Sequence, residues 1–232
     1  MKKRPPGFRF SVIDIVRQAT RAPATGGLPS PHRGGFFFAL RRGMLSGILG
    51  GSQPMSNRVT EKQVVYDGSK IRLELHHLKD DDTGRKHKRE VCVHPGAVLI
   101  LPFVDPDRIL LIRNRRYAVD ETLIELPAGT RETNEDPMSC AHRELAEETG
   151  YVAGRLVSIG DFYTSPGILS EKMYAFAAYD LTRTRTALED GEEIELLPAS
   201  FDEAVDMIRQ GQIKDGKTIA AILKYDRFFR AV

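Results

Sequence analysis

The sequence predicts an α+β fold, in which strands come first, one helix follows them, and two more helices lie near the C-terminus. Three observations support this prediction. The composition changes near Pro54, strand-like runs follow one another between residues 62 and 126, and residues 136–150 carry helix signals at both ends. Short apolar runs bounded by turn residues are typical of strands, whereas capping residues mark helices.

The segment from Met1 to Pro54 differs in composition from the rest of the chain. It holds nine Lys/Arg, one acidic residue (Asp14), nine of the 20 glycines and six of the 13 prolines. We expect a basic Gly/Pro-rich extension that is disordered, or a translation start at Met44 or Met55 that leaves it outside the natural protein. The alternative for residues 34–51 is a short amphipathic surface or membrane helix.

Composition also disfavours several classes of protein. Cys92 and Cys140 form neither a disulfide framework nor a metal-ligand spacing, which favours a reducing, cytoplasmic compartment. No apolar run approaches the ~20 residues that a membrane span needs. No clear cleavage site follows the basic start, and no aromatic residues alternate with its charges. We therefore expect no membrane partner and no nucleic-acid partner.

The predicted strands form two groups. The first is an antiparallel β meander within residues 55–95, and its runs are KQVVYDG, KIRLELHHL and KREVCV. The second belongs to a domain over residues 96–232, and its runs are GAVLILPF, RILLIRN, TLIEL, GRLVSIGDFY and KMYAFAAYDL. After TLIEL, PAGTRETNE is predicted to be a loop. Two helices are predicted near the C-terminus, over FDEAVDMIRQ and KTIAAILKYDRFF, the first of which opens on an S-x-x-E capping box.

The segment DPMSCAHRELAEETG is predicted to be a helix. Asp136 suits the N-cap, Pro137 the first turn and Gly150 the position after the helix. Met138, Ala141 and Leu145 recur at helical spacing and are expected to face a core.

The same helix gathers three carboxylates, Glu144, Glu147 and Glu148, on another face. Like charges this close repel one another unless a cation neutralises them. Mg²⁺ accepts one or two carboxylates together with substrate phosphates. The cluster therefore predicts a magnesium site for phosphate chemistry, and the alternative is a solvated acidic face.

The spacing around these carboxylates resembles the signature of the Nudix hydrolases. The matching positions are Gly129, Glu135, Arg143, Glu144, Leu145, Glu147, Glu148 and Gly150. Two positions depart from the usual pattern. Tyr151 stands where an aliphatic residue is usual, and Asn134 stands where glycine is frequent, although asparagine also tolerates left-handed backbone. The resemblance implies a Nudix α/β/α sandwich with a mixed sheet, preceded by the N-terminal meander.

Beyond this motif the chain is similar to the ADP-ribose pyrophosphatase branch. The stretches that carry this similarity are VVYDG, HPGAVLIL, IRNRRYAV, LIELPAGT, SPGILSEKMY and EDGEEIELL. Pro166 lies sixteen residues beyond Gly150, the placement associated with ADP-ribose specificity. GDP-mannose hydrolases share nearly the same layout. Relatives form homodimers through the meander, and we expect the same of this chain.

The resemblance also implies roles for individual residues. Glu144 and Glu148 correspond to direct metal ligands, Glu147 to a direct or water-mediated ligand, and the carbonyl of Ala128 to a backbone ligand. Arg143 would pair with Glu135 or Glu144 and orient the carboxylates.

The resemblance implies that the catalytic base lies on a loop beyond the motif, to which DGEEIEL corresponds best. Carboxylates that bind a cation are poor bases, which also favours a separate residue. Glu192 is the first candidate, Glu193 the second, and Glu171 the third. The alternative for DGEEIEL is a flexible acidic loop without a catalytic role.

The substrate-binding candidates precede the motif. Arg116 resembles the arginine that contacts the nucleotide in relatives, and a guanidinium can stack on a base or bind phosphate. Arg115 and Arg113 compete for that role from the other face of the strand. Glu125, in LIELPAGT, is also assigned to the substrate site.

The predicted function is therefore Mg²⁺-dependent hydrolysis (Mn²⁺ is also possible) of a nucleoside diphosphate linked to another moiety. ADP-ribose, cleaved to AMP and ribose 5-phosphate, is the first candidate. GDP-mannose or another nucleoside diphosphate sugar is the alternative within the class. A non-catalytic sensor of nucleotide sugars is the alternative from a different class.

Overall fold

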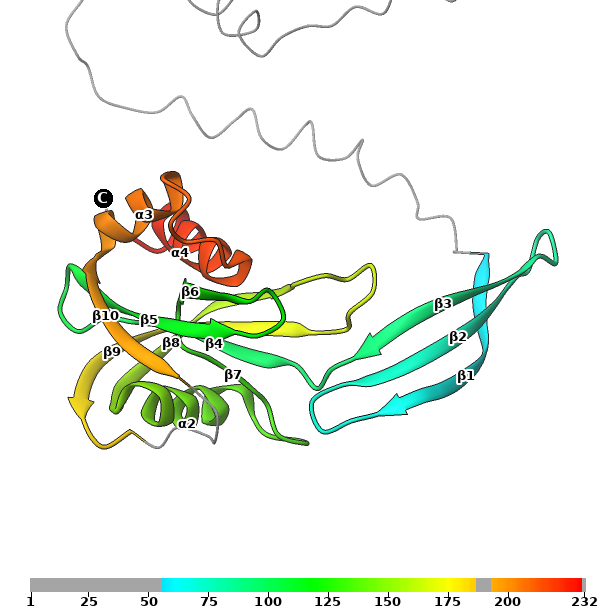
Figure 1. The fold of residues 1–232 in the computed structure, drawn as a ribbon, viewed down its shortest axis with the longest axis horizontal. Helices are drawn as coiled ribbons and strands as arrows, with labels where there is room; N and C mark the ends of the chain where they lie inside the picture. The colour runs from blue at the N-terminus through cyan, green and yellow to red at the C-terminus, as the bar shows by residue number, and fades with distance from the viewer. Residues whose placement is uncertain (1–55, 187–192, 231–232) are drawn as a thin grey trace, which may run out of the picture. The chain divides into compact units, whose positions relative to one another are not determined.

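A computed structural model describes residues 56–186 and 193–230 of the chain. The chain divides between Pro54 and Met55 into two units, and all the described residues belong to the second. That unit contains ten strands and three helices among its described residues (Figure 1). No helix in this described part of the chain is long and apolar enough to cross a membrane.

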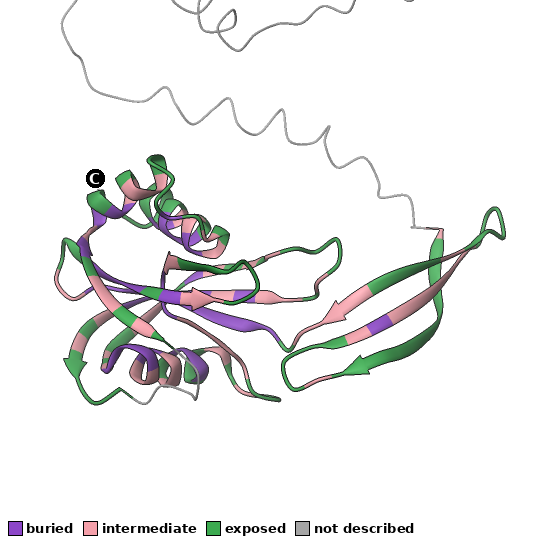
Figure 2. Ribbon diagram, in the orientation of Figure 1, coloured by how far each residue is buried: buried purple, intermediate pink, exposed green. Residues whose placement is uncertain are grey.

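The predicted meander is present. It consists of β1 (Asn57–Asp67), β2 (Arg72–Asp80) and β3 (Lys86–Val93), paired antiparallel in that order. The turn between β1 and β2 closes where Gly68 donates its N–H to the carbonyl of Ile71, at 2.9 Å. Every residue of β1, an edge strand of this sheet, is exposed (Figure 2).

The rest of the unit contains two further sheets. One is mixed, with the order β7 (Ala128–Thr130), β4 (Ala97–Pro102), β9 (Lys172–Arg183) and β8 (Tyr151–Tyr163), and its β4–β9 pair is parallel. The other is antiparallel, with the order β10 (Ile194–Ser200), β5 (Arg108–Arg116) and β6 (Glu121–Glu125).

The sequence pattern missed two of these strands. β7 lies inside the segment predicted to be a loop, and its three residues are too few to show alternation. β10 begins in an apolar run, but it contains Pro198. Because β10 is at the edge of its sheet, a residue without an N–H is tolerated there.

Strand β4 shows how the layers form. All six of its residues are buried, so the strand has no solvent face. Leu99 and Leu101 belong to one hydrophobic cluster with residues of α3 (Phe201–Arg209) and α4 (Gly216–Phe228). Val98 and Ile100 belong to a second cluster with residues of α2 (Pro137–Thr149). Helices therefore cover both faces of the sheet (Figure 1), which confirms the predicted α/β/α sandwich.

Candidate active site

Helix α2 presents the carboxylates, and its ends form as predicted. The carboxylate of Asp136 accepts hydrogen bonds from the backbone N–H groups of Met138 and Ser139, at 3.0 and 3.1 Å. At the other end, Gly150 adopts a left-handed conformation (φ 69°) and donates its N–H to the carbonyl of Ala146. These caps satisfy backbone groups that a helix end leaves unpaired, so the helix begins and ends at defined residues.

The face of α2 that points into the core differs from the prediction in one residue. Cys140, Ala141 and Leu145 are buried, as is Glu148. Met138 is 44% exposed, so the expectation that it faces the core is wrong. Met138 lies in the first turn, and Cys140 takes the core position there instead.

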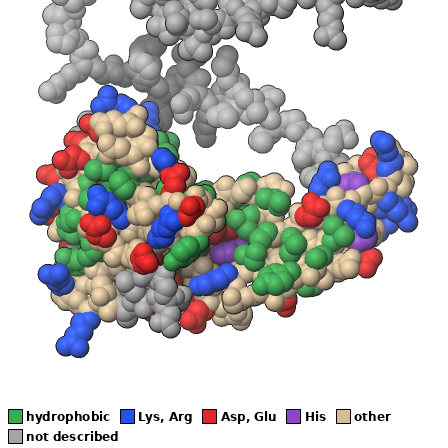
Figure 3. Space-filling view, viewed as in Figure 1, with side chains coloured by type: hydrophobic (Ala, Val, Ile, Leu, Met, Phe, Trp, Pro, Cys, Tyr) green, Lys and Arg blue, Asp and Glu red, His purple; other side chains and the backbone are tan. Residues whose placement is uncertain are grey.

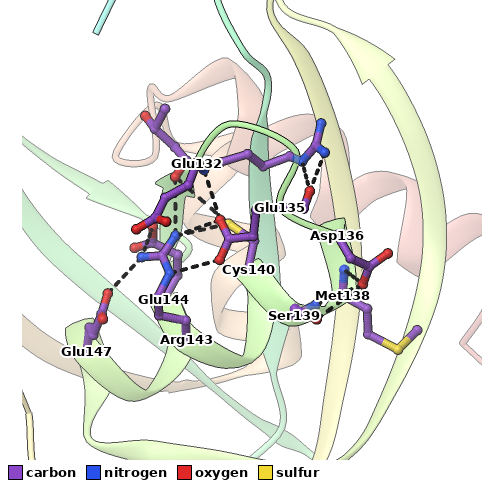
Figure 4. A network of polar contacts seen from close by, with 11 residues as sticks. Glu132, Glu135, Asp136, Met138, Ser139, Cys140, Arg143, Glu144 and Glu147 are labelled. Atoms are coloured by element: carbon purple, nitrogen blue, oxygen red, sulfur yellow. Dashed lines mark hydrogen bonds and ion pairs between the residues drawn. The ribbon is translucent and has the colours of Figure 1, made fainter. Parts of the chain in front are cut away.

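Arg143 lies at the centre of the carboxylate cluster (Figure 4). Its Nε and Nη2 atoms each donate to one oxygen of Glu135 at 3.0 Å. Its Nη1 atom donates to Glu144 at 2.8 Å and to Glu147 at 2.9 Å. One guanidinium thus contacts three carboxylates, and both partners expected for Arg143 contact it. A bidentate guanidinium holds a carboxylate in one orientation.

The ion pairs around Arg143 change proton affinities. Hydrogen bonds from Arg143 lower the pKa of Glu135 to about 2, and the same contact raises the pKa of Arg143. Burial, followed by the influence of Glu135, raises the pKa of the Cys140 thiol to about 12. Cys140 therefore stays a protonated thiol, and a nucleophilic role for it is disfavoured.

The short strand β7 lies directly against the carboxylates. The N–H of Ala128 donates to Oε2 of Glu148 at 2.9 Å, and Glu148 is only 3% exposed. A Cβ atom on Gly129 would lie 1.7 Å from the carboxyl carbon of Glu144. Only glycine fits this close approach, which gives a physical reason for Gly129 in the motif.

The donors at this site suit a hard divalent cation. Glu144, Glu147 and Glu148 offer carboxylate oxygens, Gly129 leaves the space in which the Glu144 carboxylate lies, and Ala128 offers a carbonyl. Among residues 56–186 and 193–230, no three His, Cys, Asp or Glu side chains are arranged as ligands around one point. In this structure Glu144 and Glu147 contact Arg143. The set fits Mg²⁺ or Mn²⁺ in chemical type.

A second cluster forms around Glu125, which is fully buried. Arg116 donates to both of its oxygens, at 2.8 and 2.7 Å, and Nζ of Lys217 lies 3.2 Å from one of them. Lys217 also contacts Asp215, the N-cap of α4, at 2.7 Å. The hydrogen bonds to Glu125 raise the pKa of Arg116. A buried carboxylate with two cationic neighbours is compensated, and it holds both cations in place.

A pocket of about 210 Å³ lies between β7, which contacts the carboxylates of α2, and the cluster around Glu125. Its lining residues come from four strands, one loop and the start of α4, and they are Ala97, Arg116, Ala128, Gly129, Thr130, Glu171, Met173 and Lys217. The pocket therefore has β7 on one side and the cations Arg116 and Lys217 on another. A larger cavity of about 490 Å³ lies between Phe103, Tyr179 and Tyr225 and shares no residue with the motif.

Lys217 was missed by the sequence analysis. It lies 92 residues from Glu125 along the chain, and no spacing rule connects the two. The only local signal is the capping aspartate, Asp215, which places Lys217 in the first turn of α4.

The other arginine candidates are engaged elsewhere. Arg113 pairs with Glu195 on the neighbouring strand β10, at 3.1 Å. Arg115 pairs with Asp120 in the turn that follows β5. Of the three arginines, Arg116 is the one that lines the pocket.

The candidate residues on loops beyond the motif also differ in whether they line the pocket. Glu171 lines the pocket, and Thr164 donates its hydroxyl hydrogen to it at 2.7 Å. Glu193 is exposed just before β10, and Pro166 is exposed in the segment between β8 and β9. Neither of them lines the pocket. Glu192 lies outside the described residues.

Asn134 has a φ of 62°, the left-handed geometry that the motif usually assigns to glycine.

The model of the NUDIX domain family matches residues 93–222, which are more than half of the chain.

The chain belongs to the Nudix family.

Two curated relatives illustrate its place in that family. The chain is 33% identical over 170 residues to an ADP-ribose pyrophosphatase of Bacillus subtilis. This match covers 72% of this chain and 91% of the relative. The chain is also 38% identical over 144 residues to a GDP-mannose pyrophosphatase of Salmonella paratyphi B. This second match covers 58% of this chain and 75% of the relative. The predicted resemblance to the ADP-ribose pyrophosphatase branch of the Nudix family is confirmed.

The fold has a counterpart among solved structures. A crystal structure described as an ADP compounds hydrolase matches with a TM-score of 0.68 at 20% identity, over 77% of this chain and 96% of that chain. At this identity the match concerns the fold, and it agrees with the sandwich described above.

Proposed function

We propose that this Nudix protein hydrolyses a nucleoside diphosphate linked to a second moiety. Its preferred substrate is ADP-ribose, which it cleaves to AMP and ribose 5-phosphate. The observation that carries the proposal is the pocket, where β7, which lies against the carboxylates of α2, meets Arg116 and Lys217. A diphosphate needs positive charge at both of its phosphates. The Bacillus relative, named for ADP-ribose, supports the substrate class.

The carboxylates of α2 would hold the divalent cation, Mg²⁺ in the first place. A bound cation of this kind neutralises phosphate charge and lowers the pKa of a bound water. Arg143 orients Glu144 and Glu147 through its contacts with both, and Glu148 is fixed by the N–H of Ala128. These contacts set the positions of the carboxylate oxygens before substrate arrives.

Arg116 and Lys217 would bind the nucleotide part of the substrate. Arg116 retains a side chain that is 38% exposed, and its guanidinium can stack on a base or bind a phosphate. Lys217 supplies a point charge from the first turn of α4. Glu125 keeps both of them at the pocket wall through its ion pairs.

A carboxylate outside the motif would accept the proton of the attacking water. Glu192 remains the first candidate on the resemblance, and Glu193 the second. Glu171 is the third, and it lines the pocket.

GDP-mannose is the second candidate substrate, since the relative named for it shares 38% identity with this chain. A panel of ADP-ribose, GDP-mannose and other nucleoside diphosphate sugars, with a coupled phosphatase and Mg²⁺, separates the candidates. We expect the highest kcat/KM for ADP-ribose and loss of turnover in EDTA. Binding without turnover of any compound would instead support the sensor alternative.

The protein is proposed to act as a homodimer joined through the meander. β1 is exposed along its whole length, and its apolar residues include Val64, Val65 and Tyr66, which are 52%, 58% and 59% exposed. Figure 3 shows hydrophobic side chains gathered on the meander and basic ones at its far end. Exposed apolar patches of this kind mark interaction surfaces. Light scattering that gives a monomer mass would contradict the dimer.

A further inference from the structure

The N-terminus of α4 is attached to the end of β6 by a set of polar contacts. Asp215, the N-cap of the helix, accepts two hydrogen bonds at Oδ2, from the backbone N–H of Thr218 at 3.0 Å and from its hydroxyl group at 2.7 Å. The same hydroxyl oxygen accepts the backbone N–H of Leu126 at 2.8 Å, and Thr218 is fully buried. The cap is therefore attached to the residue that directly follows Glu125.

The other oxygen of the cap contacts the ammonium group of Lys217. Nζ of Lys217 lies 2.7 Å from Oδ1 of Asp215 and 3.2 Å from Oε2 of Glu125. The side chain of Lys217 is 21% exposed, whereas those of Asp215 and Glu125 are 10% and 1% exposed. Lysine carries its charge on a flexible four-carbon stem. Two nearly buried carboxylates therefore restrict this charge to one place at the pocket wall.

The charges of this cluster balance one another. The cations Arg116 and Lys217 pair with the carboxylates of Glu125 and Asp215. Removal of the charge of Asp215 would make the cluster more positive, which by itself favours an anionic substrate. If Asp215 instead places Lys217, its removal should weaken substrate binding, because the ammonium group loses its shorter contact. The two roles therefore differ in the sign of their effect.

The proton affinity of Asp215 agrees with the contact. Burial raises the pKa of this carboxyl group, but the charge of Lys217 and the hydrogen bonds from Lys217 and Thr218 outweigh burial, so the pKa lies below its usual range. The group is therefore an ionised carboxylate at neutral pH. A hydrogen bond between an ammonium group and an ionised carboxylate is about twice as strong as a neutral one.

We propose that Asp215 is a positioning residue for Lys217, which it holds where the ammonium group contacts a phosphate of the substrate. The inference rests on the proposed function, because it takes the pocket to be the substrate site. Only one of the two oxygens of Asp215 is used to cap the helix, and the other has Lys217 as its partner. The N-cap of α4 thus acts on the substrate site as well as on the helix.

Two variants of the full chain, Asp215→Asn and Asp215→Ser, test the proposal through kcat and KM for ADP-ribose and Mg²⁺. Asparagine and serine cap helices about as well as aspartate, but neither carries the charge that holds Lys217. We expect KM to rise about fivefold in both variants, within the range of coupling between neighbouring residues, with kcat changed by less than about twofold. A KM that falls or stays unchanged overturns the proposal. Ser200→Asn, at the N-cap of α3, is the matched control and should leave KM unchanged.

A double-mutant cycle shows whether the effect acts through Lys217. In the Lys217→Gln background, Asp215→Asn should change KM by less than about twofold, since the cation that it holds is absent. An equal rise in KM in both backgrounds overturns the proposal, because Asp215 would then act on binding independently of Lys217.

A readout without turnover uses ¹³C NMR of the Asp215 carboxyl group and needs no variant of Asp215. Since Lys217 lowers the pKa of Asp215, Lys217→Gln should raise the midpoint of its titration. Lys224→Gln, about two turns further along α4, is the control and should leave the midpoint unchanged. An unchanged midpoint in Lys217→Gln overturns the contact between the two side chains. If wild type hydrolyses no member of the substrate panel, the proposed function fails, while this measurement still decides whether Asp215 holds Lys217.

Discussion

The carboxylate side of the pocket and its cationic side differ in how their residues come together. The carboxylate side is built from one continuous stretch, Gly129 to Gly150, which folds as a short strand, a loop and helix α2. The cationic side takes Arg116 from β5, Glu125 from β6 and Lys217 from α4. Local spacing sets the first side, whereas only sheet pairing and helix packing create the second.

This difference has an energetic counterpart. On the carboxylate side, Arg143 compensates residues on its own helix and in the preceding loop. On the cationic side, a fully buried Glu125 depends on two cations from other elements. Breaking a buried ion pair by removing one partner leaves an uncompensated charge. Changes on the cationic side should therefore affect stability as well as binding, whereas changes to the exposed part of the carboxylate side should affect chemistry.

The largest effect is expected from Glu148→Gln. Glutamine keeps the size of the side chain and an acceptor for the N–H of Ala128, but it removes a charge proposed to hold the cation. We expect turnover to fall by at least ~100-fold, consistent with metal charge stabilisation of several kcal/mol.

Asp206→Asn, on the exposed surface of α3, serves as the control and should be neutral. Circular dichroism checks that both variants fold. Turnover of Glu148→Gln within threefold of wild type would show that the carboxylate cluster is not the cation site.

Variants of the candidate bases test whether a carboxylate outside the carboxylate and cationic sides of the pocket completes the site. We expect Glu192→Gln to lower kcat by ~100-fold, in the range for loss of a general base, with KM changed by only a few fold. Glu193→Gln should have much less effect. Steady-state kinetics of the two variants and of Glu171→Gln identify the base, and a large loss in Glu171→Gln alone would move the assignment to the pocket wall.

Gly129→Ala tests how closely the loop approaches the helix. The added Cβ would lie 1.7 Å from the carboxyl carbon of Glu144, so the loop or the carboxylate must move. A small displacement of catalytic groups can cost up to about 100-fold in rate, and we expect a loss of at least tenfold.

Gly167→Ala is the matched control, because a Cβ there would meet nothing within 4 Å. Both variants are compared by kcat and by melting temperature. If Gly129→Ala behaves like Gly167→Ala, the proximity of loop and carboxylate has no functional consequence.

A smaller effect is expected from Lys217→Gln. Loss of one charged contact to a phosphate corresponds to about 1.5 kcal/mol at the low end of its range, or a rise in KM of roughly tenfold. Lys214→Gln is the control, since Lys214 pairs with Glu121 on the exposed surface and does not line the pocket. An unchanged KM for Lys217→Gln would remove this residue from the substrate site.

The smallest effect is expected from removal of the segment from Met1 to Pro54. If the extension is disordered or untranslated, a protein that begins at Met55 should keep its melting temperature and its kcat/KM. A drop of several degrees, or of several fold in kcat/KM, would show that the extension packs on the domain or completes the site.

The sequence by itself was sufficient for the fold class and for the carboxylate motif. Asp136, Pro137 and Gly150 predict the ends of α2 because caps act within a few residues of the backbone groups that they satisfy. Glu144 and Glu148 share a helical face because they are four residues apart. The three residues of β7 were too few to predict, and Met138 proved exposed since end positions of a helix depend on what packs beside them.

The tertiary structure alone decided which residues face the motif across the pocket. Three arginines occur within four positions of β5, and only the sheet shows that Arg116 turns toward Glu125 while Arg113 and Arg115 pair elsewhere. The contact of Lys217 with Glu125 carries no signal in the sequence, because the two residues are 92 positions apart and meet only after β6 and α4 have packed. Local interactions leave a periodic trace in a sequence, whereas long-range ion pairs leave none.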